Sequence, residues 1–299
     1  MTSRKRIELL VGLIISLLIM LTSCGSTGGG GAFEPGDCIV PEFNSESAEE
    51  ESGFEVDYSG LASGYVAVKA GSDYEKLVLQ INFGDAQYNY WFDSDNKILV
   101  VPLQYGDGTY VVKVLKNTTG DKYAEIYSQS KSVQLSDEFQ PFIRSNSMVN
   151  YTKDSNAVQE ASSLASQSEN DADFVKNVYK YIEGEVDYDQ EFADSNPEIY
   201  YPVLDNTLST GKGICFDYAA LAAGMLRSQG IPTKLITGYV NLDGDLYHAW
   251  NMVYIKNEGW ITAEISVSPN DWNRIDITLD DTGDISKLGS DSYTQKDIY

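Results

Sequence analysis

The chain has 299 residues with 45 acidic and 21 basic side chains, a formal net charge of −24. This excess of acids excludes a nucleic-acid-binding surface, because phosphate binding requires clustered lysine and arginine. One histidine and three cysteines exclude multi-histidine metal centres, zinc ribbons and disulfide scaffolds. A hydrophobic share of 42% supports folded cores, and the length is typical of about two domains.

Residues 1–23 have the order of a secretory signal peptide. A basic head precedes a mostly apolar run from Leu9 to Leu21, which is too short for a membrane-spanning helix of about 20 residues. The run ends in Leu-Thr-Ser-Cys-Gly, with the cysteine at Cys24, and this word resembles the lipobox of bacterial lipoproteins. The resemblance implies cleavage before Cys24, lipid on its thiol and a location on the extracellular face of the bacterial membrane. The alternative is an ordinary signal peptide with a chance cysteine.

Residues 24–53 are rich in glycine, serine and glutamate, a composition that does not bury a core. We therefore expect a flexible tether between the lipid and the first domain. Cys38 lies in this segment, and we assign it no role.

Residues 54–140 are expected to form an antiparallel β-sandwich of immunoglobulin-like type. Apolar residues alternate with polar ones in 77–83, and strands 98–103 and 110–115 are joined through Gly-Asp-Gly at 106–108, which predicts a hairpin turn. Five aromatic residues either form a glycan-binding platform or pack in the sandwich, and we favour packing. These residues are Tyr88, Tyr90, Trp91, Tyr105 and Tyr110.

In residues 141–299 the pattern changes from strands to helices followed by strands, which predicts an α+β domain. A composition rich in alanine and serine predicts a helix over 154–168, and helical spacing of apolar residues marks 171–186 and 214–228. The chain then becomes β, with strands expected at about 233–240, 247–255, 260–267, 272–279 and 293–299.

Two residues of this domain have the types and positions of a nucleophile and its base. Cys215 lies in the first turn of the third helix, where unpaired N–H groups and the helix dipole favour a thiolate. The same N–H groups could hold a developing oxyanion. His248, the only histidine, lies in a strand, from which an imidazole could pair with the thiolate and act as general acid. Taken singly, each residue is more often a structural one, and it is their combination that indicates catalysis.

The segment from about Ser209 to Tyr299 resembles the transglutaminase-like superfamily, whose papain-like folds place a cysteine helix before a sheet that carries histidine and then aspartate. The resemblance implies that Cys215 is the nucleophile, that His248 is its base, and that two further matching residues, Asp217 and Tyr218, support the helix. The words that carry it are Gly213-x-Cys215-x-Asp217-Tyr218-Ala219, Leu226-Arg227-x-x-Gly230-Ile231-Pro232, Thr237-Gly238-Tyr239 and His248-Ala249-Trp250.

The third catalytic residue has two candidates. Compact relatives place the acid at the end of the strand after the histidine, which here is Glu264. A longer variant of the family ends in Trp-x-x-x-Asp-x-Thr, which here places Asp276 between Trp272 and Thr278. We favour Asp276, because it keeps the aspartate with both neighbours, whereas the extra methylene of Glu264 changes the reach of its carboxylate.

We therefore expect a lipid-anchored thiol enzyme that acts on amide bonds of a peptide or protein, including cell-wall peptide, through a Cys215–His248–Asp276 triad and a thioester. Hydrolysis is favoured over amine transfer, because water needs no second pocket. No cofactor or metal is expected. The alternative is a catalytically idle surface-binding or scaffold protein whose β-sandwich contacts glycan or protein.

Overall fold

The computed structural model of the protein describes residues 32–51, 53–71, 76–92, 97–195, 199–241, 245–263 and 293–299. Two large hydrophobic cores divide this part of the chain, one among the strands of the first half and one around the helices that follow. In the same residues, no helix is long and apolar enough to cross a membrane.

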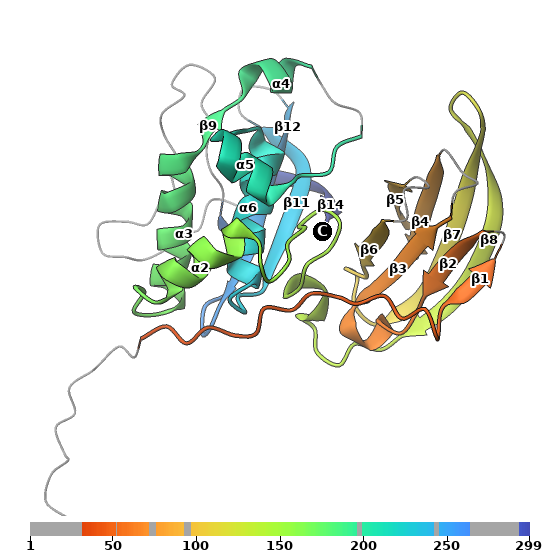
Figure 1. The fold of residues 1–299 in the computed structure, drawn as a ribbon, viewed down its shortest axis with the longest axis horizontal. Coiled ribbons are helices and arrows are strands. Elements are labelled where there is room, and N and C mark those ends of the chain that lie inside the picture. Colours follow the sequence, from red (N-terminus) through yellow and green to blue (C-terminus); the bar gives the residue numbers. More distant parts are fainter. Residues whose placement is uncertain are drawn as a thin grey trace, which may run out of the picture. The chain divides into compact units, whose positions relative to one another are not determined.

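The first core is enclosed by two four-stranded antiparallel sheets (Figure 1). One sheet has the order β1 (Glu49–Glu51), β2 (Phe54–Asp57), β3 (Tyr65–Ala70) and β6 (Ile98–Pro102). The other has the order β5 (Ala86–Phe92), β4 (Leu77–Phe83), β7 (Gly108–Thr119) and β8 (Lys122–Val133). The alternation predicted in 77–83 is confirmed, since Leu77, Leu79 and Ile81 are fully buried in this core. Both sheets supply the core, which makes this half a β-sandwich.

The hairpin expected at residues 106–108 is wrong, because the chain crosses there from one sheet to the other. β6 pairs with β3, whereas β7 pairs with β4 and β8. The buried hydroxyl of Tyr110 fixes the crossing: it accepts a hydrogen bond from the Tyr105 amide at 3.0 Å. Its own hydrogen reaches the carbonyl of Leu103 at 3.1 Å or that of Gly106 at 3.0 Å. A glycine-rich turn suits such a crossing as well as it suits a hairpin.

The packing interpretation of the aromatic residues is confirmed for three of them. Tyr90 and Tyr110 are fully buried and Tyr88 is 5% exposed, all within the core of the sandwich. Tyr88 meets Tyr90 edge to face, with ring centroids 5.9 Å apart. Such side chains are part of the core and do not form a surface platform.

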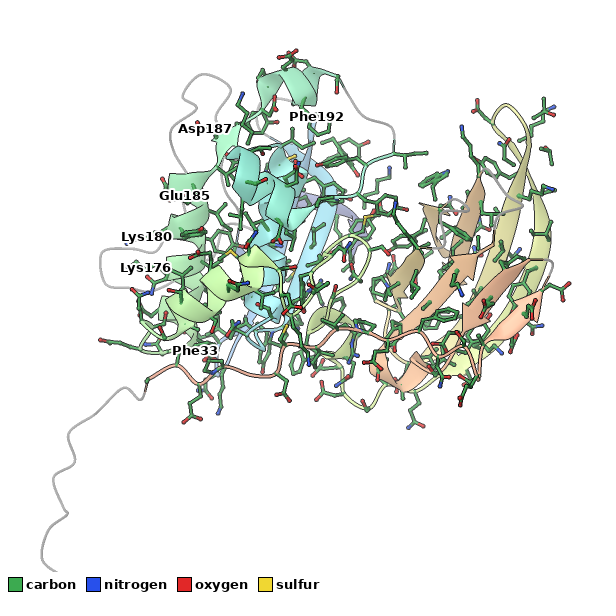
Figure 2. All side chains as sticks on the ribbon, in the orientation of Figure 1. Phe33, Lys176, Lys180, Glu185, Asp187 and Phe192 are labelled. Atoms are coloured by element: carbon green, nitrogen blue, oxygen red, sulfur yellow. The ribbon has the colours of Figure 1, made fainter. Side chains whose placement is uncertain are left out.

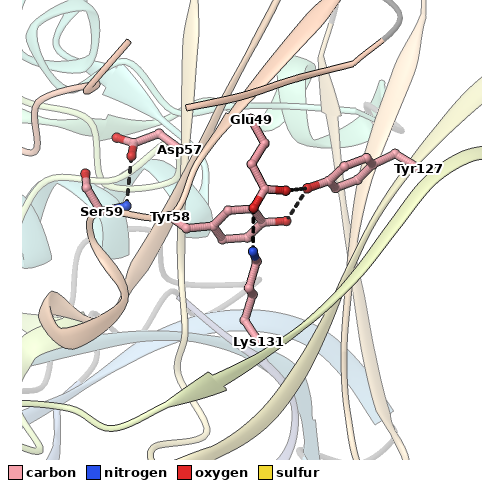
Figure 3. Close-up of polar contacts among 6 residues, drawn as sticks. All are labelled: Glu49, Asp57, Tyr58, Ser59, Tyr127 and Lys131. Atoms are coloured by element: carbon pink, nitrogen blue, oxygen red, sulfur yellow. Dashed lines mark hydrogen bonds and ion pairs between the residues drawn. The ribbon is translucent and has the colours of Figure 1, made fainter. Parts of the chain in front are cut away.

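One open edge of the sandwich is closed by a polar network between β1 and β8, the edge strands of the two sheets (Figure 3). The Glu49 carboxylate accepts hydrogen bonds from Lys131 Nζ and from the Tyr127 hydroxyl, each at 2.6 Å. The Tyr58 hydroxyl donates to that of Tyr127 at 2.9 Å, and Lys131 Nζ lies 3.9 Å from the centre of the Tyr58 ring. These bonds lower the pKa of Glu49. The network thus ties the edge strands of the two sheets to each other.

The second core is built around α6 (Cys215–Arg227), which contacts α2, α3 and α5 and packs against a four-stranded antiparallel sheet (Figure 1). The sheet has the order β13 (Gly259–Ala263), β12 (Asp245–Ile255), β11 (Thr233–Asn241) and β14 (Tyr293–Ile298). The other elements are α2 (Asn156–Ala165), α3 (Asp171–Glu185), β9 (Asp187–Tyr188), α4 (Gln190–Asp194), α5 (Leu204–Thr210) and β10 (Lys212–Gly213). The three predicted helices are confirmed as α2, α3 and α6. The strand expected at 272–279 lies outside the described residues.

Residues 32–48, which we call the strap, have fixed contacts and so differ from the flexible tether expected for 24–53 (Figure 1, red). Phe33, labelled in Figure 2, is 7% exposed. It stacks on Phe174 of α3, with ring centroids 4.6 Å apart. The Gly36 amide donates to the carbonyl of Gln229 at 2.8 Å. A Cβ atom on Gly36 would lie 2.9 Å from the Cα of Gly230, so the two backbones touch. The buried ring of Phe33 and the close contact of Gly36 therefore hold the strap in place, although its composition is polar.

Replacing Phe33 with alanine is expected to lower the free energy of unfolding by about 3 kcal/mol, because it removes a buried ring and leaves a cavity against Phe174. Chemical denaturation measures the change. Glu34→Ala, at the exposed neighbouring position, is the matched control and is expected to change stability by less than about 0.5 kcal/mol. Equal stability of the two variants would contradict a packed strap.

Candidate active site

The start of α6 is built by Asp217, whose side chain folds back over the first turn. One carboxylate oxygen accepts a hydrogen bond from the Ile214 amide at 2.9 Å, and the other accepts one from the Tyr200 hydroxyl at 2.6 Å. A Cβ atom on Gly213 would lie 2.7 Å from the Cβ of Asp217, so only glycine leaves room for this arrangement. The spacing Gly213-x-Cys215-x-Asp217 thus fixes Cys215 as the first residue of the helix.

Burial acts against the charge on Asp217 and raises its pKa, while the hydrogen bonds from Tyr200 and Ile214 oppose the rise. The hydroxyl of Tyr218, the next residue of the helix, donates a hydrogen bond to the carbonyl of Val186 at 2.6 Å. Both residues therefore hold the helix in place, as expected, because each ties it to a separate segment of the chain.

The Cys215 thiol faces the backbone of β12. Hydrogen bonds from the amides of Ala249 and Phe216 lower its pKa, but burial is the largest effect and the pKa is raised overall. The helix N-terminus alone would lower the pKa of this thiol, as expected from the sequence, but burial outweighs it. Tyr188 lies near Cys215. Burial raises the pKa of Tyr188 to about 12, and the negative charge of a Cys215 thiolate is the second cause of this rise.

The Cys215 sulfur lies near the backbone of Ala249, the residue that follows His248 in β12. His248 lies in β12 opposite Gly238 of β11, and Ala249, whose amide reaches the Cys215 sulfur, follows it directly. Burial lowers the pKa of His248 to about 4. At neutral pH both the thiol and the imidazole are therefore uncharged in the resting protein.

Asn251 connects α6 to the strand that carries His248, a role that the sequence argument did not assign. Its side-chain nitrogen donates to the carbonyls of Ala219 at 3.0 Å and Lys234 at 3.3 Å, and its oxygen accepts from the Tyr179 hydroxyl at 2.9 Å. Asn251 is 1% exposed. The signal in the sequence is an amide at a strand position whose neighbours two residues away, Ala249 and Val253, are buried against the helix.

Both candidates for the third catalytic residue, Glu264 and Asp276, lie outside the described residues, as does Cys24. The described part of the chain holds no group of three or more histidine, cysteine, aspartate or glutamate side chains placed to bind a metal ion. Of the expected triad, the described residues therefore contain Cys215 and His248.

Alkylation of Cys215 by iodoacetamide is expected to accelerate steadily as the pH rises above 7, because only the thiolate reacts and burial raises the pKa of this thiol. Peptide mapping by mass spectrometry separates Cys215 from Cys38, the other free cysteine of the described residues. If the rate instead stayed constant from pH 5 to pH 8, a thiolate–imidazolium pair would exist at rest, contrary to this expectation.

The stability of the protein is expected to depend on His248 between pH 6.5 and pH 4. Its pKa is about 4 in the folded protein and 6.5 as the ordinary value. The unfolded chain therefore takes up a proton in this window before the folded one does, and stability is full above it and falls with decreasing pH. The loss is about 3 kcal/mol. Denaturation at pH 7 and pH 4.5 measures it, and His248→Gln is expected to lose less than the unaltered protein. Equal losses would show that His248 is not the cause.

Comparisons with known proteins show that part of the chain is similar to one family. Residues 159–265 match the model of the transglutaminase-like superfamily. No curated protein matches the chain. A solved structure of a proposed cysteine protease from Cytophaga hutchinsonii is similar at 11% identity, covering 84% of this chain and 83% of its own, with a TM-score of 0.40. Red sea bream transglutaminase is similar at 15% identity, covering 67% of this chain and 47% of its own, with a TM-score of 0.31.

Proposed function

We propose that this protein, whose residues 159–265 form a transglutaminase-like domain, is a thiol enzyme that cleaves amide bonds of peptides or proteins. The observation that carries the proposal is the position of Cys215. It begins α6, and its sulfur meets the amide of the residue that follows the only histidine of the chain. A cysteine at a helix N-terminus, packed against the strand that carries a histidine, has the elements of acyl transfer.

The resting pair is neutral, so the thiol proton passes to His248 as the sulfur attacks the amide carbonyl carbon. The backbone N–H groups at the start of α6 stabilise the oxyanion that forms. When the intermediate collapses, the C–N bond breaks and the imidazolium returns its proton to the leaving amine. The acyl group then remains on Cys215 as a thioester. Water, deprotonated by His248, attacks this thioester and releases the acid and the free thiol.

Water is the acceptor we favour over an amine, because hydrolysis requires no second binding pocket. Asp276 is proposed to orient the imidazole, with Glu264 as the alternative. We also propose that the protein is held at the extracellular face of the membrane by lipid on Cys24, since the lipobox-like word follows a basic head and an apolar run. Cell-wall peptides would then be within its reach.

An electrophilic peptide probe tests the proposal. An acyloxymethyl ketone is expected to label Cys215 in the folded protein much faster than Cys38, and His248→Ala is expected to slow the labelling. Cys38→Ser, which leaves Cys215 in place, is the matched control and is expected to label normally. A panel of wall-derived and protein peptides, incubated with and without a fluorescent primary amine, then distinguishes hydrolysis from amine transfer.

The raised pKa of Cys215 and the lowered pKa of His248 favour one other candidate, a catalytically idle protein that keeps the fold. In that case the probe would label Cys215 no faster than Cys38, and no amide would be cleaved. This result would overturn the proposed enzyme.

A further inference from the structure

A groove of about 520 Å³ lies along the edge of the sandwich formed by β5 and β6, opposite the edge that the Glu49 network closes. Its other wall is the loop of residues 199–203, whose Tyr200 holds Asp217 at the start of α6. The Tyr201 hydroxyl donates to the carbonyl of Trp91 at 2.7 Å and joins the two walls. This volume is within the range of ligand-binding pockets.

The lining is apolar and unusually exposed. Ile98, Ile199 and Val203 are 47%, 51% and 53% exposed, and among the described residues the other exposed large hydrophobic side chains are two tyrosines at 41% and 49%. Trp91 and Phe92 add aromatic surface to the same groove. Exposed apolar side chains gathered in one place, and not scattered singly, mark a surface that a partner covers.

The groove also offers an open strand edge. The amide of Val100 donates to Ser147 Oγ and its carbonyl accepts from the Ser147 amide, both at 2.9 Å, so these groups point away from β3. Ile98, two residues earlier in the same strand, has the same orientation and has no backbone partner on that side among the described residues. Its amide and carbonyl thus have the direction that an added strand would pair with.

The lining of the groove includes a positive side chain. Lys76 belongs to this lining, and none of the described residues that line the groove is acidic. The whole chain has a net charge of −24. Although the chain as a whole repels an anion, the Lys76 ammonium can pair with a carboxylate at this place.

We propose that this groove binds an extended peptide segment that carries apolar side chains and a carboxylate. The segment adds a backbone pair to Ile98, places its apolar side chains against Ile98, Ile199 and Val203, and directs its carboxylate to Lys76. Strand addition supplies affinity through the backbone, and the side-chain contacts supply specificity. The site is separate from Cys215 and does not depend on catalysis.

Fluorescence anisotropy with two probes tests the proposal. The probes are fluorescein-labelled octapeptides, blocked at the C-terminus, that alternate valine with threonine and differ only in one central residue, glutamate or lysine. The full chain with Cys215→Ala is used, so that cleavage cannot consume the probe. The glutamate peptide is expected to bind at least about tenfold more tightly than the lysine peptide.

Lys76→Glu is expected to remove this preference, and Val203→Asp is expected to weaken both peptides about tenfold or more. Both positions are exposed, so the fold is retained, which thermal unfolding verifies. Lys122→Glu makes the same charge change at an exposed position of β8 outside the groove and is expected to leave binding unchanged. The proposal is overturned if neither peptide binds at millimolar concentration, if both bind equally, or if Lys122→Glu acts as Lys76→Glu does.

Discussion

Replacing Cys215 with alanine is expected to lower kcat/KM for amide cleavage by at least about 10³-fold. The reason is that no other described thiol lies at a helix N-terminus beside β12, so the acyl group has no second acceptor. Initial rates on a peptide substrate identified by the probe screen measure the effect. Cys38→Ala is the matched control and is expected to retain full activity.

His248→Ala is expected to cause a loss of similar size, since the chain has no second histidine to take the thiol proton. Residues that act as one unit are not additive, so the double variant is expected to be no slower than either single one. If His248→Ala reduced the rate less than tenfold, the imidazole would not be the base of this site.

Replacing Arg227 with methionine is expected to lower the free energy of unfolding by about 4 kcal/mol, because three backbone carbonyls lose the guanidinium donor, although the Tyr299 carbonyl keeps the Leu235 amide. Arg227 is fully buried, and burial lowers its pKa to about 10, so it remains charged at neutral pH. Its guanidinium donates to the carbonyls of Thr233 at 2.8 Å, Arg144 at 3.2 Å and Tyr299 at 2.6 Å. It thereby ties the end of α6 to three separate segments.

Chemical denaturation measures this loss, and hydrogen exchange shows where it acts. Arg227→Lys keeps the charge but not the planar fork of donors, so it is expected to recover only part of the stability. Lys212→Met, which removes an exposed positive charge, is the control and is expected to change stability by less than about 0.5 kcal/mol. A loss below about 1 kcal/mol in Arg227→Met would show that the three carbonyls find other partners.

The helices and the position of Cys215 were predictable because their signals are local. The apolar spacing of α3 and the glycine before Cys215 act within a few residues of the chain. The crossing at 106–108 was not, because the same glycine-rich turn serves a hairpin and a change of sheet, and the deciding contact is the Tyr110 hydroxyl. Nor did composition reveal the strap, whose order depends on the single ring of Phe33 packed against a helix far along the chain.

The candidate site divides in the same way. The motif placed Cys215 and His248 on their elements, but the direction of the Cys215 pKa depends on burial, which arises only when α6 packs on the sheet. The groove at Ile98 and Val203 is likewise a product of tertiary structure, since its two walls belong to different parts of the sequence. Taken alone, the first half of the chain offers only a strand edge and the second half only a loop.

The contact between Gly36 and Gly230 has a consequence for the order of folding. The strap is made early in synthesis, yet its partners are the carbonyl of Gln229 and the backbone of Gly230, which follow the end of α6. Bringing Gly36 to Gly230 closes a long loop, and the chain loses conformational entropy before this contact stabilises it. The first part of the folded body to be synthesised is therefore among the last to find its place, and a chain that stops short of Gly230 leaves Gly36 without its partner.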